Sequence, residues 1–111
     1  MFLIVSKYLV PKGFSGLTAF PFIFVKYHVD KENLVFINHE KIHLRQQKEL
    51  LILLFFVCYF LEYLVRLIQF KNRNLAYRNI SFEREAYANE ADLNYLKNRS
   101  SFEFTKYLFI N

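Results

Sequence analysis

The feature that most constrains the fold is an apolar segment in the middle of the chain. Leu50 to Leu61 are twelve consecutive apolar residues, and the segment continues to Phe70 with only Glu62 and Arg66 charged. Twelve residues are too few to cross a bilayer, whereas about twenty with one ion pair suffice. Glu62 and Arg66 are spaced i, i+4 and can neutralise each other on a helix surface. We therefore expect a helix that spans a membrane, lies on one, or is buried in a core.

The composition predicts one folded domain, residues 1–111, with unusually much apolar surface to bury. Hydrophobic residues make up 54% of the chain and aromatic residues 20%, with two Gly and two Pro. Such a composition excludes a disordered chain, and the length allows a single modest core. The excess of apolar residues requires burial in the core, in an oligomer interface or in lipid.

Charge and cysteine content narrow the partners and the compartment. The net charge is +5, but the cations are spread along the chain and no nucleic-acid-binding motif accompanies them, so we expect no nucleic acid partner. An anionic membrane surface fits better. Cys58 is the only cysteine and permits a cytosolic environment, and residues 1–7 lack the basic start of a signal peptide. We expect a cytoplasmic protein, or one at or in the inner membrane, that is not secreted.

Residues 39–43 read His-Glu-Lys-Ile-His, an HExxH motif. Two histidines four apart project from one face of a helix, where their imidazoles can bind a single Zn²⁺. Glu40 then lies where it can hold and deprotonate a water molecule. A catalytic zinc site needs three protein ligands and one open position. A third ligand must therefore come from elsewhere in the chain.

Several side chains are candidates for the third ligand. A lone loop histidine is usually solvated, and Glu62 is better explained as the partner of Arg66. The stretch 81–90 is rich in carboxylates, and a carboxylate in the first turn of a helix lies at its positive end, which favours the ionised form. The full set of candidates is His28, Asp30, Glu32, Glu62, Glu83, Glu85, Glu90 and Asp92.

The metal motif also constrains the apolar segment. If residues 50–70 crossed a bilayer once, the two histidines would lie on one side and everything after residue 71 on the other. No later residue could then complete the site, so either the segment does not cross or the third ligand does not come from the C-terminal third. We therefore favour a helix that is buried in the core or lies at a membrane surface.

The N-terminal third has the pattern of strands. Residues 2–10 and 17–26 are rich in β-branched and aromatic residues, and Pro11-Lys12-Gly13 separates them. Pro21 indicates an edge strand or a bulge. We predict a small hairpin or meander over residues 2–27.

The remainder of the chain has the pattern of helices. The residues 34–37 are a short apolar lead into the HExxH helix, and residues 71–80 are a polar connection with a turn of helix. Ser81 is the predicted N-cap of a helix over residues 82–98. Ser100 and Glu103 form a capping-box pattern before a short last helix over residues 101–109. The expected fold class is α+β and mostly helical: a small N-terminal hairpin or meander, the HExxH helix, a long apolar helix, a third helix with the downstream glutamate, and the short C-terminal helix.

With both motifs in view, the chain resembles the gluzincin class of zinc metallopeptidases. In that class an HExxH helix supplies two histidines and a glutamate on a later helix supplies the third ligand. The matching stretches here are residues 39–43 and Glu83-Arg84-Glu85-Ala86-Tyr87. The combination with Gln46 also looks like a group of small uncharacterised bacterial proteins, and BlaR/MecR-type peptidase domains share the same order. The resemblance covers about residues 34–92.

The resemblance implies a Zn²⁺ cofactor held by His39, His43 and Glu83, with Glu40 as general base. Glu83 is favoured because Ala86 then matches an alanine of the family. Tyr87 departs from the pattern, since many gluzincins have an aspartate there. Glu85 stays an alternative ligand, with Asn89 in the aspartate's position.

The expected function is zinc-dependent hydrolysis of a peptide or protein. Zinc lowers the pKa of a bound water and polarises the scissile carbonyl, and Glu40 takes the water's proton and later delivers it to the leaving amine. Gln46 or Gln47 can fix a histidine ring or the packing of the helix. Tyr87 or another tyrosine can stabilise the oxyanion, and the run 17–26 can offer an edge to an extended peptide.

A second function class stays open from the sequence. The alternative is a non-catalytic, membrane-associated interaction protein with a structural or vestigial metal site. In either case the apolar helix 50–70 is the expected contact with a membrane surface or with a second copy of the chain.

Overall fold

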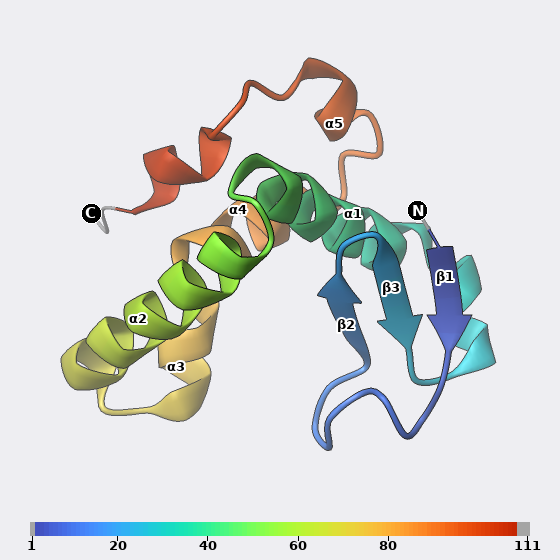
Figure 1. Cartoon of the computed structure of the whole chain (residues 1–111), viewed down its shortest axis with the longest axis horizontal. Helices are drawn as coiled ribbons and strands as arrows, with labels where there is room; N and C mark the ends of the chain where they lie inside the picture. The colour runs from blue at the N-terminus through green and yellow to red at the C-terminus, as the bar shows by residue number, and fades with distance from the viewer. Residues whose placement is uncertain (1, 109–111) are drawn as a thin grey trace.

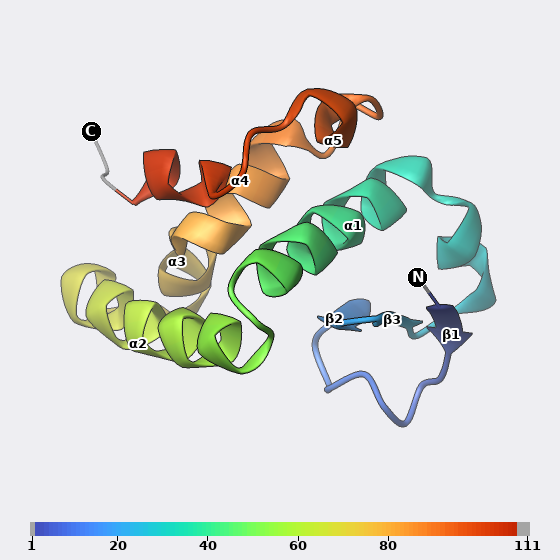
Figure 2. The ribbon, with the colours of Figure 1, turned by 45° about the horizontal axis from the view of Figure 1, so that its top comes forward.

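The structure is a computed structural model that describes residues 2–108 and, for residues 28 and 29, the backbone without the side chains (Figure 1). The predicted α+β class is confirmed, because a small sheet at the N-terminal end is followed by helices. In Figure 2 the sheet is seen edge-on, with the first long helix lying across one of its faces.

The sheet is built from three short strands, β1 (Phe2–Val5), β2 (Gly16–Ala19) and β3 (Phe22–Val25), in the order β1-β3-β2. β2 and β3 form the predicted hairpin, but β1 pairs parallel to β3, so the meander is wrong. The run 17–26 is two strands rather than one. Pro21 lies in the turn between them, where its missing N–H costs no bond of the sheet. The first strand ends at Val5, and the loop after it carries the chain to the opposite edge.

The HExxH motif lies on α1 (Leu34–Glu49), which packs on the sheet. The side chain of Asn33 accepts a hydrogen bond from the Phe36 N–H at 3.1 Å and caps this helix. The predicted apolar lead is therefore the first turn of α1. Ile37 and Leu44 pack against Ile23 and Val25 of β3 in one hydrophobic core. This packing fixes the motif over the sheet.

The apolar segment forms α2 (Leu53–Phe70), and its exposure contradicts a buried core helix. Leu51 and Ile52 have positive φ angles of 57° and 34°, so the chain bends between α1 and α2. Only 11% of the residues of this helix are buried. By length and composition it is the one helix within residues 2–108 that could cross a membrane. Glu62 and Arg66 form the predicted ion pair at 3.5 Å, but both side chains are largely buried.

Two short helices follow, α3 (Arg73–Arg78) and α4 (Ser81–Asn89). The turn of helix expected within residues 71–80 is thus confirmed. The predicted N-cap is wrong, because Ser81 is already in the helix and its hydroxyl donates to Glu62 at 2.6 Å.

The predicted helix 82–98 is interrupted and continues as α5 (Tyr95–Asn98). The amide of Asn38 on α1 explains the interruption, since its Nδ2 donates at 2.9 Å to the carbonyls of Glu90 and Asp92. These carbonyls are bound to a side chain instead of to a following turn of helix. The last helix is a 3₁₀ turn over Glu103–Tyr107 without the predicted serine cap, and Phe109 lies outside the described residues.

The C-terminal segment is fixed by a buried ion pair network. Arg99 donates to the Glu85 carboxylate on α4 and, at 2.7 Å and 3.0 Å, to Glu49 at the end of α1. The side chains of Arg99 and Glu85 are fully buried. The carboxylate of Glu85 also accepts from Gln46 and Tyr95. The network joins three segments that are distant in sequence.

We expect Arg99→Met to lower the free energy of unfolding by about 3–5 kcal/mol, because it leaves the Glu85 carboxylate buried without its cation. Lys106→Met is the matched control, because it removes an ion pair at the surface. The Lys106 side chain is 71% exposed, so loss of its pair with Glu103 is expected to leave stability unchanged. Urea unfolding of the two variants measures the difference. Equal urea midpoints for Arg99→Met and the native chain would contradict the role of the network.

Candidate metal centre

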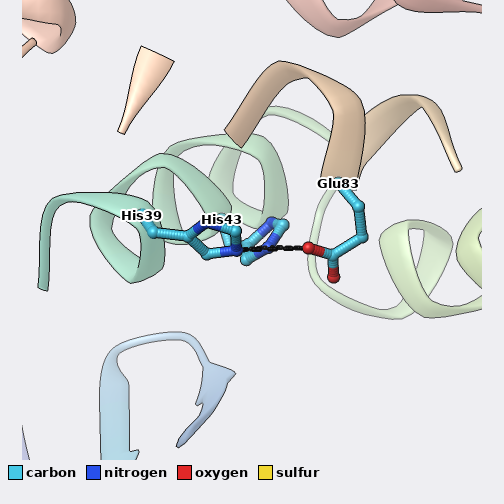
Figure 3. Close-up of side chains that lie close together, drawn as sticks. All are labelled: His39, His43 and Glu83. Carbon is cyan, nitrogen blue, oxygen red and sulfur yellow. Dashed lines mark hydrogen bonds and ion pairs between the residues drawn. The ribbon is translucent and has the colours of Figure 1, made fainter. Parts of the chain in front are cut away.

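Two helices bring three metal-ligating side chains together (Figure 3). His39 and His43 project from α1, and Glu83 projects from the first turn of α4; all three are buried. Glu83 Oε1 lies 3.2 Å from His39 Nε2 and 3.0 Å from His43 Nε2, and the two Nε2 atoms are 3.2 Å apart. Ligand atoms of a tetrahedral zinc site lie about 3.3 Å apart. The cluster can therefore hold a metal ion through three of four tetrahedral positions.

Gln46 orients His43 through the ring nitrogen that faces away from the cluster. His43 Nδ1 lies 2.8 Å from Gln46 Oε1, and Gln46 Nε2 donates to Glu85 Oε1 at 2.9 Å. A donated Nδ1–H directs Nε2 into the cluster, an arrangement that is typical of metal-binding histidines in known proteins. Gln46 thus has the orienting role expected from the sequence.

His39 is positioned in a similar way from the other end of α4. Its Nδ1 lies 3.4 Å from Glu90 Oε1, and its ring meets the Tyr87 ring edge-on with centroids 4.5 Å apart. Glu90 was among the candidate ligands, but it lies behind His39 and not in the cluster. It is an orienting group for the histidine.

The second oxygen of Glu83 is bound by a residue that the sequence did not indicate. Tyr59 on α2 donates its hydroxyl to Glu83 Oε2 at 2.6 Å, which leaves Oε1 for the metal position. Burial and then the Glu83 carboxylate raise the pKa of the Tyr59 hydroxyl, which keeps it a donor. An unbroken apolar run gives no local signal that one of its members holds a site carboxylate.

The other candidate ligands lie outside the cluster wherever their side chains are described. Glu85 points to the opposite side of α4, where Arg99 binds it, so the alternative to Glu83 is not supported. Glu62 accepts from Ser81 and Arg66. The side chain of His28 lies outside the described part of the structure. Asp30, Glu32 and Asp92 are not members of the cluster.

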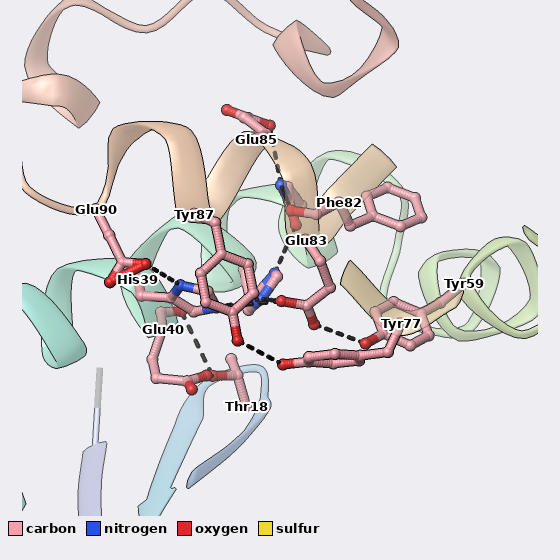
Figure 4. Close-up of polar contacts among 12 residues, drawn as sticks. Thr18, His39, Glu40, Tyr59, Tyr77, Phe82, Glu83, Glu85, Tyr87 and Glu90 are labelled. Carbon is pink, nitrogen blue, oxygen red and sulfur yellow. Dashed lines mark hydrogen bonds and ion pairs between the residues drawn. The ribbon is translucent and has the colours of Figure 1, made fainter. Parts of the chain in front are cut away.

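Glu40 reaches the site from the same helix as the histidines (Figure 4). Its Oε2 accepts a hydrogen bond from Thr18 Oγ1 on β2 at 2.5 Å. Gly16, also on β2, makes room for this contact: a Cβ there would lie 3.2 Å from Glu40 Oε1 and 2.6 Å from the Phe36 ring. Thr18 was missed because its role depends on which residue of the strand faces α1.

Two hollows that share His39 and Glu40 in their linings lie beside the cluster. A cavity of about 270 Å³ is lined by the three cluster residues, Glu40 and Tyr77. A wider cleft of about 1020 Å³ also reaches His39 and Glu40 and has aromatic walls. The Tyr77 and Tyr87 hydroxyls are 3.2 Å apart, and burial raises the pKa of both. These tyrosines are hydrogen-bond donors beside the metal position.

The charges of the cluster compensate one another when no metal is bound. Burial alone would lower the pKa of His43, but the Glu83 carboxylate outweighs it and raises that pKa to about 9. Burial likewise opposes the charge of Glu83, and the two histidines, His43 first, hold its pKa well below its usual range. A proton on His43 therefore occupies the nitrogen that a metal ion would need.

We expect zinc affinity to fall with decreasing pH below about 9, by about tenfold per unit, because each zinc ion must displace the His43 proton. Binding at pH 7 then releases about one proton to the buffer from this histidine. Competition with a chromophoric chelator between pH 7 and 9 measures the slope. An affinity that is constant over this range would rule out the protonated histidine.

Glu83→Gln is expected to weaken zinc binding at least about 100-fold, because an amide is a poor ligand and the negative charge is lost. Glu90→Gln is the matched control on the same helix, and it should cost about tenfold by loosening His39. Zinc content after dialysis and competitive titration measure both. Equal losses in the two variants would mean that Glu83 is not a ligand.

Comparison with known proteins adds no further assignment. No protein-family model, no curated protein and no solved structure matches the chain. The resemblance of residues 34–92 to gluzincins thus stays a prediction from two short motifs. What the structure does establish is a buried cluster of two histidines and a glutamate that can hold a metal ion.

Proposed function

We propose that this chain is a zinc-dependent hydrolase that cleaves peptide bonds, with Glu40 as the general base. The observation that carries the proposal is the position of Glu40, whose side chain lines the same cavity as the metal cluster. A structural metal site is closed by four protein ligands and needs no carboxylate beside it. The gluzincin resemblance implies the same assignment.

The HExxH spacing together with the donor set favours zinc over calcium and magnesium. Two imidazoles and one carboxylate are typical of catalytic zinc sites, which keep a fourth position open. Ca²⁺ and Mg²⁺ prefer sites made of oxygen atoms. When bound, zinc would lower the pKa of a water molecule and polarise the carbonyl of the substrate.

The protein side chains supply the remaining parts of the reaction. Glu40 accepts the proton of the attacking water and passes it to the leaving amine. Thr18 holds Oε2 of that carboxylate, so Oε1 stays available for the proton. We assign Tyr77, which lines the cavity, as the donor to the oxygen that becomes negative. The Tyr87 hydroxyl is hydrogen-bonded to the Tyr77 hydroxyl and lies on its outer side.

The edge of the sheet supports a peptide as substrate. β2 is an edge strand, and Gly16, Leu17 and Thr18 line the cavity. Gln47 already binds the outward-facing Thr18 carbonyl and Phe20 N–H, both at 2.7 Å. By the alternation of a strand, the N–H and C=O of Gly16 face the same way. An extended peptide can add to the sheet at Gly16, next to Glu40.

Glu40→Gln is expected to keep stoichiometric zinc and to lower hydrolysis by about 10²–10⁴-fold, because the base is lost while the ligands remain. A fluorescently labelled unfolded protein and a mixed peptide library serve as substrates. Glu32→Gln, on an exposed residue, is the matched control and should keep full activity. When both variants are purified in the same way, a loss in Glu40→Gln alone excludes a contaminating peptidase. Hydrolysis that persists in Glu40→Gln would overturn the mechanism. A native protein that binds zinc but cleaves none of these substrates would favour the non-catalytic alternative.

A further inference from the structure

The outer side of α2 is apolar along its whole length. Its most central residues recur at helical spacing and are 39–77% exposed; we call this set the outer face: Leu53, Val57, Phe60, Leu61, Leu64 and Ile68. Leu54, Phe56 and Val65 flank the outer face and are exposed as well. In Figure 2 the helix runs along the outside of the molecule, with α3 and α4 on one side only.

Three polar side chains of the same helix, Tyr59, Glu62 and Arg66, point inward, and Gln69, exposed in its last turn, accepts from Arg66 at 2.9 Å. Tyr59 donates to Glu83, and Glu62 accepts from the backbone and hydroxyl of Ser81. Arg66 donates to the Leu108 carbonyl at 2.5 Å. A surface helix of a soluble protein has the opposite arrangement, with its polar residues toward water. Polar groups turned inward and apolar groups turned outward are typical of helices that contact lipid.

The charges around α2 favour lipid over a second copy of the chain. Between residues 50 and 80 the sequence has one carboxylate, Glu62, which faces inward. Exposed cations flank the helix, Lys48 before it and Lys71 and Arg73 after it. Two copies paired through the outer face would bring like charges together in either orientation, which is unfavourable. Anionic lipid headgroups complement these cations.

We propose that α2 docks through its outer face onto the surface of an anionic lipid bilayer and lies in the plane of that surface. It does not cross the bilayer, because α4 packs on its inner side and would carry the metal cluster into hydrocarbon. A helix of 18 residues is about 27 Å long, so the contact extends along one side of the protein. Phe56 and Phe60 also line the wide cleft, so docking places the cleft beside the headgroups.

Flotation of the full chain with lipid vesicles tests this proposal. We expect binding to vesicles with about one third phosphatidylglycerol in phosphatidylcholine, and weaker binding at high salt. Leu61→Glu and Leu64→Glu should each reduce partitioning at least about tenfold. Lys71→Gln and Arg73→Gln should each reduce it about fivefold.

Leu93→Glu is the matched control, since Leu93 is 49% exposed and lies beyond α4, away from the outer face. It should leave vesicle binding unchanged, and far-UV circular dichroism confirms that each variant is folded. Equal binding to pure phosphatidylcholine, equal effects of Leu93→Glu and Leu61→Glu, or resistance to carbonate extraction would overturn the proposal. The proposal would also be overturned if the chain formed a dimer in solution that Leu61→Glu dissociates and that does not bind vesicles. None of these measurements uses hydrolysis, so the result is independent of the proposed activity.

Discussion

The contact of the Glu83 carboxylate with two histidines is the interaction on which the rest of the structure depends. A buried carboxylate is costly unless charges or hydrogen bonds compensate it, and here His39, His43 and Tyr59 all do so. These partners come from α1 and α2, while Glu83 comes from α4. Side chains of three helices therefore meet at the Glu83 carboxylate, and this contact fixes how the three helices lie relative to one another.

The same contact explains why the site belongs to the whole chain and not to one motif. The sheet supplies Thr18 to Glu40, and the C-terminal segment supplies Arg99 to Glu85 on the far side of α4. Because Glu83 and Glu85 lie on opposite sides of that helix, one faces the cluster and the other anchors the helix. Two neighbouring carboxylates thus have separate functions that depend on their partners.

The parts that the sequence predicts are those with local signals. The HExxH spacing predicts a shared helix face, and the combination with the residues 83–87 predicts a third ligand from a later helix. The position of β1 is set by a parallel pairing between distant segments, which no local pattern encodes. The sequence left α2 open between a core helix and a helix at a membrane surface, because an apolar run is the same in both; the low burial of α2 excludes the core. The spacing of Tyr59, Glu62 and Arg66 places their polar groups on one side of the helix. In the structure this side faces inward, which leaves the apolar side exposed.

Asn38 and Gln46 fasten the two ends of α4 to α1, on either side of the histidine pair. Asn38 binds the Glu90 and Asp92 carbonyls, and Gln46 binds the Phe82 carbonyl at 3.1 Å. With both ends fixed, the spacing between Glu83 and the histidines cannot widen without breaking one of these bonds. Large ions with about six to eight ligands need a wider and more adaptable cage. The two amides thereby hold the three side chains at a spacing that suits a small ion, although neither touches the position that an ion would occupy.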